Sequence, residues 1–157
     1  MKKVNIGKDY APRATMKDLL DDDIPHRGQV MLANEIFLGN HNDNSSLANS
    51  EIEKKIRGYK NQDSKKGIHD ASTLITLEEC LEKMVAAKLL CSYCSTPMKI
   101  IYKMARDPTQ WTLDRVDNDL GHTNKNTVVA CLGCNLQRRR TDSEKFSFTK
   151  KLVIKKT

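Results

Sequence analysis

Apolar residues recur at helical spacing most clearly between Leu77 and Leu89. One face of this segment is apolar and the rest carries glutamate and lysine, which predicts an amphipathic helix packed on a core. Thr76 and Glu79 have the spacing of a capping box, so the helix is expected to begin there. Cys80 falls on the apolar face, and we interpret it as a small core residue. The apolar positions are Leu77, Cys80, Leu81, Met84, Val85 and Leu89.

The hydrophobic pattern upstream of this helix is weaker. Residues Val30–Leu38 are mostly apolar and fit a buried helix or a strand equally well. Residues 39–50 are rich in Asn, Ser, Asp and Gly, which favour turns, and they are the best candidate for a boundary in the chain. A second capping box at Ser50 and Glu53 predicts a short helix that ends near Tyr59.

Downstream of the amphipathic helix the pattern becomes that of strands. Residues 98–104 (MKIIYKM) and 111–116 (WTLDRV) are expected strands, and residues 127–130 are β-branched and short like a third. Turn-forming residues separate the last two strands. A helix-permissive run, NLQRRRTDSEKF, follows Cys134. The predicted fold class is therefore α+β.

Composition and charge add a constraint on partners. Hydrophobic residues make up 38% and aromatic residues 5% of the 157-residue chain, so part of it is expected to be extended or loosely packed. The net charge is +7, and residues 121–157 carry nine basic and two acidic side chains. Such a surface attracts polyanions, although a solvated lysine-rich tail explains the charge about as well. No apolar run approaches the roughly 20 residues that span a bilayer, so we expect a soluble intracellular protein without membrane contact.

The five cysteines point to a metal site. Four of them form two Cys-x-x-Cys pairs, Cys91 with Cys94 and Cys131 with Cys134, separated by 36 residues. The cysteines occur as Cys-x-x-Cys pairs, and their total number is odd. Both features argue against a secreted disulfide scaffold and indicate a protein that resides in a reducing compartment. Four thiolates suit one tetrahedral Zn²⁺ and leave no open position for water, so the expected zinc is structural.

The segment from residue 90 to residue 140 resembles the HNH endonuclease family. The resemblance depends on CSYC, on LDR followed by N-x-V, and on CLGCN taken together. The segments LDRVDND, GHT and TVV also look like HNH proteins encoded by phages and large DNA viruses. It implies a ββα-metal motif and a metal-dependent DNA endonuclease, in which Asp114 and Asn135 hold one Mg²⁺ or Mn²⁺ ion by their oxygens. It also implies that Asn126 braces the loop and orients the general base.

The chain departs from the family pattern at Arg115. The family has a histidine base immediately after the aspartate, whereas an arginine stays protonated and cannot accept a proton from water. Arg115 could instead hold a phosphate oxygen or stabilise developing charge. His122 is the best replacement as base, because imidazole titrates near neutral pH. Asp117 and water on the metal ion are the competitors.

Basic residues after Cys134 complete the expected site. A helix there would bring Arg138, Arg139 and Arg140 near the metal ion, where they are expected to contact phosphates, and Lys145 would extend this surface. The expected partner is DNA, with RNA not excluded, and double-strand cleavage would need a homodimer. The rival hypothesis is a non-catalytic, zinc-stabilised module that binds nucleic acid, inside a larger assembly for example.

The predicted domain organisation follows from these patterns. Residues 71–157 are expected to form the HNH-like, zinc-bound ββα-metal domain with its basic tail. Residues 1–70 are expected to form an N-terminal extension of short helices, with an arm over residues 1–14. This extension could serve as an interface or as a DNA-contacting segment.

Overall fold

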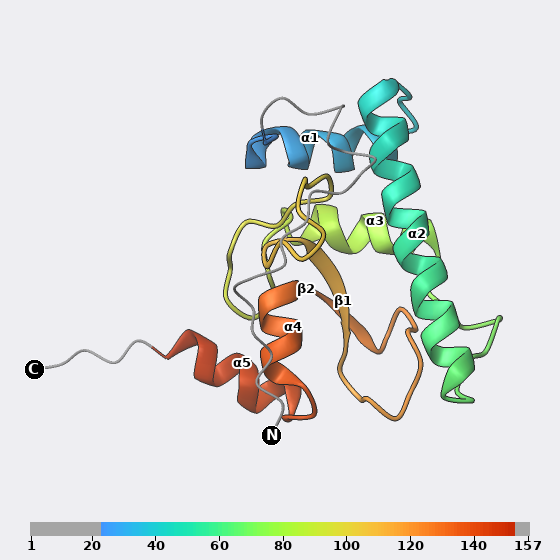
Figure 1. The fold of residues 1–157 in the computed structure, drawn as a ribbon, viewed down its shortest axis with the longest axis vertical. Coiled ribbons are helices and arrows are strands. Elements are labelled where there is room, and N and C mark those ends of the chain that lie inside the picture. Colours follow the sequence, from blue (N-terminus) through green and yellow to red (C-terminus); the bar gives the residue numbers. More distant parts are fainter. Residues whose placement is uncertain (1–22, 153–157) are drawn as a thin grey trace, which may run out of the picture.

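A computed structural model describes residues 23–152, and it confirms the α+β class (Figure 1). The arm expected over residues 1–14 lies outside the described residues. None of the described helices is both long and apolar enough to cross a bilayer. The elements in chain order are α1 (His26–Phe37), α2 (Asp43–Lys65), α3 (Leu77–Ala86), β1 (Trp111–Arg115), β2 (Thr127–Cys131), α4 (Leu132–Arg138) and α5 (Ser143–Lys151).

Helix α2 overturns the expected boundary over residues 39–50. The helix begins at Asp43 because Asn42 and Ser45 form a capping box: the Asn42 side chain accepts from the Ser45 amide at 2.9 Å, and Ser45 Oγ accepts from the Asn42 amide at 2.8 Å. The predicted cap at Ser50 is therefore wrong, and the helix continues beyond Tyr59 to Lys65. Most of α2 faces solvent, so its polar composition hid a helix whose buried face is narrow.

Helix α3 confirms the amphipathic prediction, although it ends earlier than expected. Its capping box is present, with the Glu79 amide donating to Thr76 Oγ1 at 3.2 Å. Lys88 and Leu89 adopt positive φ angles of 52° and 55°, which end the helix and turn the chain toward Cys91. Cys80 is fully buried, and burial raises the pKa of its thiol to about 12, as suits a core residue.

One hydrophobic core joins the first and second halves of the described chain. Side chains of α1, α2 and α3 pack with those of the two strands, and the core includes Ile52 and Met84 as well as Trp111. Core side chains from both sides of residue 70 thus pack together. The division of the chain into an extension and a domain stays a prediction.

The buried Gln29 of α1 explains why residues 98–104 are not a strand, contrary to prediction. Its side-chain oxygen accepts from the amides of Ile100 and Ile101 at 2.9 and 3.0 Å, and its amide donates to the Ile101 carbonyl at 2.6 Å. These bonds satisfy the backbone that a neighbouring strand would otherwise satisfy. The segment is an extended loop with buried Ile100 and Ile101.

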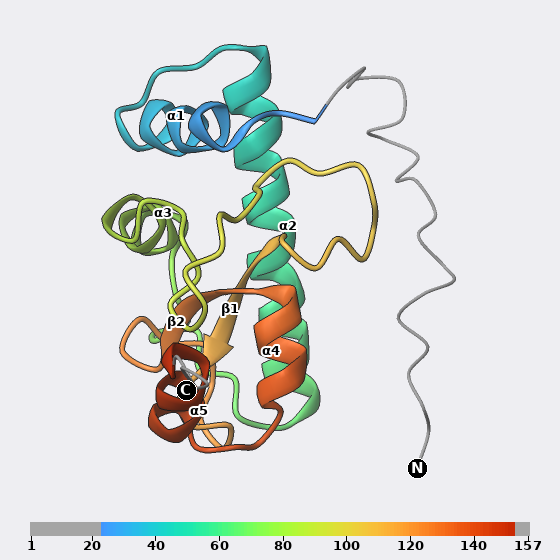
Figure 2. The same ribbon diagram turned by 90° about the vertical axis from the view of Figure 1, so that its left-hand side faces the viewer.

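The two expected strands from residue 111 onward are confirmed as an antiparallel hairpin. Trp111 pairs with Cys131 and Arg115 with Thr127. Helix α2 runs along the outer side of β1, where the Leu113 amide donates to the Tyr59 hydroxyl at 3.0 Å (Figure 2). Helix α4 packs against both strands. The hairpin therefore lies between α2 and α4.

The expected helix after Cys134 is divided into two helices. Helix α4 starts at Leu132, before the second cysteine of its pair, and ends at Arg138. The next residue, Arg139, has a φ of 51°, which is incompatible with a continuing helix. Asp142 then caps α5 by accepting from the Lys145 amide at 3.0 Å. Because of this break, the consecutive residues Arg138, Arg139 and Arg140 do not lie on one continuous helix.

Candidate functional site

The four cysteines of the two pairs lie together at one end of the hairpin. Their sulfur atoms are all within 4.8 Å of one another, and the Sγ atoms of Cys94 and Cys131 are 3.8 Å apart. Tetrahedral zinc with bonds of about 2.3 Å places its sulfur ligands about 3.8 Å apart, so this donor set fits the ion. Cys91 and Cys94 follow α3, Cys131 ends β2 and caps α4, and Cys134 lies in the first turn of α4.

Local turns aim both cysteine pairs at one point. Ser95 adopts a φ of 60°, and its amide donates to the Cys91 carbonyl at 2.9 Å, which closes the first Cys-x-x-Cys turn. The Cys134 amide donates to Cys131 Sγ at 3.4 Å in the second. A hydrogen bond shared by Cys91 and Cys131 lowers the pKa of Cys91 and raises the pKa of Cys131. The four cysteines are therefore placed to hold a metal ion, as the sequence predicted.

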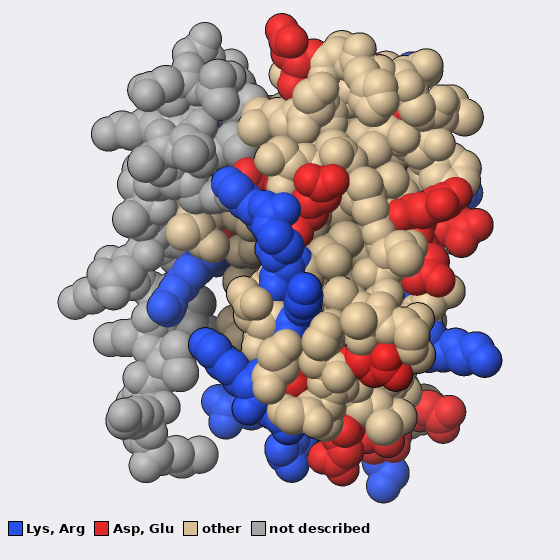
Figure 3. Space-filling view, turned by 90° about the vertical axis from the view of Figure 1, so that its right-hand side faces the viewer, with Lys and Arg blue, Asp and Glu red and all other residues tan. Residues whose placement is uncertain are grey.

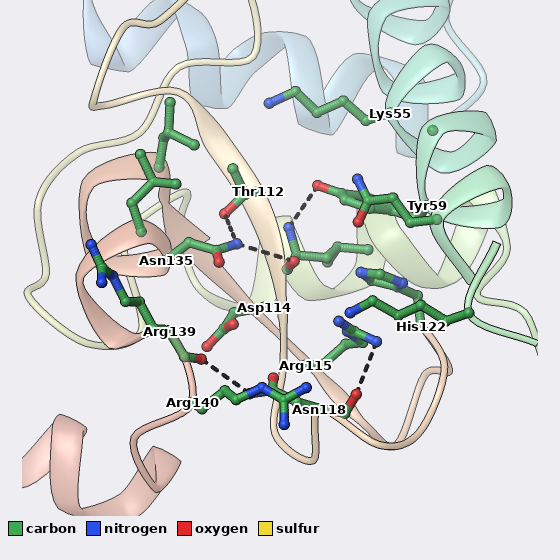
Figure 4. A pocket seen from close by; sticks show the side chains of 16 residues that line it. Lys55, Tyr59, Thr112, Asp114, Arg115, Asn118, His122, Asn135, Arg139 and Arg140 are labelled. Atoms are coloured by element: carbon green, nitrogen blue, oxygen red, sulfur yellow. Dashed lines mark hydrogen bonds between the residues drawn. The ribbon is translucent and has the colours of Figure 1, made fainter. Parts of the chain in front are cut away.

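A cleft of about 580 Å³ lies between α2 and α4, with β1 at its floor (Figure 4). We call it the α2–α4 cleft. Thr112 and Asp114 are two residues apart on β1 and so project from the same face of the strand. The Thr112 hydroxyl meets Asn135 of α4, so this is the face that α4 covers. The strand thereby aims Asp114 at α4, whose last residue, Arg138, is its partner.

Asp114 is only 5% exposed and is held by one of its two carboxylate oxygens. Its Oδ2 accepts from the Tyr93 hydroxyl at 2.5 Å and from Arg138 Nη1 at 2.8 Å. Among the described residues no hydrogen bond reaches Oδ1, and Asp114 lines the cleft. This carboxylate is thus fixed in orientation with one oxygen available to a ligand.

Asn135 also presents an oxygen to the cleft. Its side-chain nitrogen donates to Thr112 Oγ1 at 3.0 Å and to the Leu113 carbonyl at 3.4 Å. Thr112 Oγ1 already donates to the Ala130 carbonyl at 2.8 Å, so both partners of Asn135 act as acceptors and the amide cannot be reversed. Its oxygen is therefore turned away from the strand, and Figure 4 shows it on the side of Asp114. Two oxygens on neighbouring elements suit a hard divalent cation.

His122 lines the same cleft and is held by a carboxylate that the sequence did not indicate. Its Nδ1 is 2.7 Å from Asp63 Oδ1, its backbone amide donates to Asp63 Oδ2 at 2.8 Å, and its ring stacks on Tyr59 with centroids 4.4 Å apart. An acceptor at Nδ1 places the proton there and leaves Nε2 with a lone pair. Burial lowers the pKa of His122 and outweighs the opposing effect of Asp63, while Arg115 lowers it further. The imidazole is therefore neutral at pH 7.

Asn126, Asp117 and Arg115 were also expected to take part in the site, and the structure gives each of them a different position. Asn126 braces the loop: its Oδ1 accepts from the Asp117 amide at 2.9 Å, and its Nδ2 donates to the carbonyls of Asp117 and Gly121 at 2.9 and 3.0 Å. Asp117 is exposed, accepts from the Asp119 amide and lies outside the cleft wall. Arg115 does line the cleft, where its Nη1 donates to the carbonyls of Asn118 and Leu120.

The expectation that Arg138 contacts phosphates on the surface is wrong. Its side chain is only 2% exposed. Nη1 donates to Asp114 Oδ2 and the Arg115 carbonyl, Nη2 to the Val116 carbonyl at 2.8 Å, and Nε to the Thr141 carbonyl at 2.8 Å. Helical geometry turned Arg138 toward β1 because it lies four residues after the buried Cys134.

Arg139 and Arg140 lie at the mouth of the cleft, where the break after α4 exposes them. Lys55 of α2 and Lys66, the residue that follows the helix, line the opposite wall. Lys145 is on α5 and is not part of the wall. Figure 3 shows Lys and Arg side chains gathered in a band on one side of the molecule. The basic surface thus includes part of α2, within the segment for which the sequence left a DNA-contacting role open.

Two residues of the site were missed from the sequence. Asp63 follows Tyr59 by four residues and Ile52 by eleven, so it lies on the buried face of α2, and a helix extended past Tyr59 would have shown this. Tyr93 lies between the first two cysteines. Its position beside the expected zinc site was the only sign in the sequence that it could belong to the functional site. Comparison of the chain with protein-family models, curated proteins and solved structures finds no match. The function therefore has to be argued from the site itself.

Proposed function

We propose that this protein is a metal-dependent endonuclease that hydrolyses phosphodiester bonds in DNA. One observation carries the proposal: oxygens of Asp114 and Asn135 face a single cleft that also holds the neutral imidazole of His122. A carboxylate, an amide oxygen and a base in one basic-walled cleft form the minimal set for metal-assisted phosphodiester hydrolysis. The resemblance of residues 90–140 to HNH endonucleases supports the same reaction.

Each side chain has a role in this proposal. Asp114 Oδ1 and the Asn135 side-chain oxygen hold Mg²⁺ or Mn²⁺, which stabilises charge on the phosphate and on the leaving oxygen. His122 takes a proton through Nε2 from the water that attacks phosphorus, and the bond from phosphorus to the 3′ oxygen breaks. Asp63 keeps the imidazole in the tautomer that can accept this proton. Arg115 lies beside the bound phosphate and balances its charge.

The four cysteines support this site from outside. A structural Zn²⁺ joins the loop after α3 to the start of α4, and Asn135 is the residue after the ligand Cys134. Tyr93, between Cys91 and Cys94, donates to Asp114. Zinc binding in this proposal therefore fixes elements that hold both oxygen ligands of the catalytic ion.

A plasmid-nicking assay with added Mg²⁺ or Mn²⁺ tests the proposal. We expect wild-type protein to nick supercoiled plasmid and Asp114→Asn to lose at least about 100-fold of the rate, because one oxygen ligand and its charge are lost. Asp117→Asn is the matched control, since this exposed carboxylate is three residues from Asp114 in sequence but lies outside the cleft. Nicking that survives in Asp114→Asn would overturn the proposal.

The identity of the base is tested in the same assay. His122→Ala is expected to lower the nicking rate by about 100-fold, within the usual range for a general base. Asp117→Asn should stay within about threefold of wild type. If His122→Ala also stays within about threefold, the base is not His122 and metal-bound water is the remaining candidate.

One observation favours a second function, that of a zinc-stabilised module that binds nucleic acid without cleaving it. The ion pair of Asp114 with Arg138 neutralises part of the carboxylate charge on which a divalent cation would depend. This alternative predicts that wild-type protein binds DNA in a salt-dependent manner and nicks no plasmid with either metal ion. Metal-dependent nicking that Asp114→Asn abolishes would exclude it.

A further inference from the structure

One side of α2 forms a complete wall of the α2–α4 cleft. The residues of this helix that line the cleft recur every three or four positions, as one helical face requires. Figure 4 shows Tyr59 of α2 on the opposite side of Asp114 from Arg139, which follows α4. The lining residues are Lys55, Gly58, Tyr59 and Gln62 of α2 and Lys66, the C-cap residue that follows it.

Gly58 is the unexpected member of this wall. Glycine in a helix interior destabilises the helix relative to alanine, and Gly58 lies well inside the 23-residue α2. Its backbone has no positive φ, and a Cβ atom built on it would meet nothing within 4 Å. Neither packing nor backbone conformation within the described structure therefore requires glycine here. The absent side chain leaves open space at this position, and Gly58 lines the cleft.

The depth of Asp114 makes contact with this wall necessary. Among the described residues, the 5% exposed carboxylate is open to a phosphate through the cleft between α2 and α4. Gln62 and Lys66 are exposed on the α2 side, and Arg139 is exposed on the α4 side, so donors for phosphate oxygens are present on both walls. A strand bound in this cleft would meet, at Gly58, a stretch of α2 that has no side chain.

We propose that α2 is a binding subsite for the sugar–phosphate backbone of the DNA strand to be cut, and that this strand crosses the helix at Gly58. The inference depends on the proposed endonuclease function, since it concerns the same cleft. Glycine at this position permits close approach of the strand, as glycine does where a backbone meets a phosphate chain elsewhere. Lys66, just after α2, and Arg139, just after α4, then contact phosphates on the two sides of Asp114.

Substitution of Gly58 tests the subsite. Binding of a fluorescein-labelled DNA oligonucleotide, single-stranded and as a duplex, is measured by anisotropy without added Mg²⁺ or Mn²⁺. We expect Gly58→Leu to weaken binding of the preferred form by at least about tenfold, because its side chain occupies the space of the strand. Asn61→Leu, one helical turn away and outside the cleft wall, is the matched control and should stay within about twofold.

Gly58→Ala separates the subsite from a purely structural effect. This change should raise the thermal midpoint by about 1–4 °C, because alanine favours the helix, yet weaken DNA binding by at least about twofold. It also decides the question if Gly58→Leu does not fold. Unchanged affinity in Gly58→Ala and Gly58→Leu, with wild-type nicking intact, overturns the subsite and leaves the endonuclease proposal standing. Wild-type protein that neither binds nor nicks DNA overturns both.

Discussion

The buried ion pair of Arg138 with Asp114 makes a quantitative prediction about folding stability. Arg138→Met removes the charge and keeps much of the side-chain volume, which leaves the buried Asp114 with Tyr93 as its remaining partner among the described residues. The change also removes the donors to three backbone carbonyls, those of Arg115, Val116 and Thr141. Removing one partner of a buried pair typically costs about 3–5 kcal/mol, because the other charge stays buried without compensation.

A loss of this size is large for a chain of 157 residues. At about 2–4 °C per kcal/mol, the thermal midpoint should fall by about 6–20 °C. Urea unfolding followed by circular dichroism measures the free energy directly, and the slope of the transition shows whether it remains two-state. The double variant Asp114→Asn with Arg138→Met should be less destabilised than the sum of the single variants, because the buried carboxylate charge is then absent.

Arg140→Met is the matched control for this prediction. Arg140 is exposed at the mouth of the cleft, so its replacement should change stability by no more than about 0.5 kcal/mol. If Arg140 contacts a phosphate, the same variant should reduce the salt slope of DNA binding by about 0.9. A stability loss below about 1 kcal/mol in Arg138→Met, or an equal loss in both variants, would refute the reasoning.

Four further predictions follow from the site. Cys134→Ser should lose bound zinc, measured by mass spectrometry of the purified protein's metal content, and should unfold at lower temperature; full zinc retention would contradict the four-cysteine site. Nicking should fall as the pH drops, with a midpoint below 6.5, because burial lowers the pKa of His122 and only its neutral form accepts a proton; a midpoint above 6.5 contradicts this. Asp63→Asn should move that midpoint to still lower pH, because the charge that raises the pKa of His122 is lost; an unchanged profile would show that Asp63 does not act on the base. Tyr93→Phe should weaken Mn²⁺ binding about 10-fold to 100-fold in titration calorimetry, since one donor that orients Asp114 disappears, and equal affinity would exclude that role.

Local patterns were enough to predict several parts of the structure. The amphipathic spacing after Thr76 predicted α3, alternation and β-branching predicted β1 and β2, and the Cys-x-x-Cys spacing predicted the cluster of Cys91 and its three partners. Asn126 was expected to brace its loop, and it does. In each case the deciding interactions lie within a few residues along the chain, or the residue type has few other uses.

The tertiary structure alone decided the parts that depend on distant partners. Gln29 replaces a strand for residues 98–104 from 72 positions away in sequence, and Asp63 holds His122 across 59 positions. The break at Arg139 separated one buried arginine from two exposed ones. The sequence by itself determined which residues could ligate a metal or carry charge. Which of them face the cleft, and which are used to hold Asp114 in place, depended on burial and hydrogen bonding between segments far apart in the chain, and a linear pattern does not encode these.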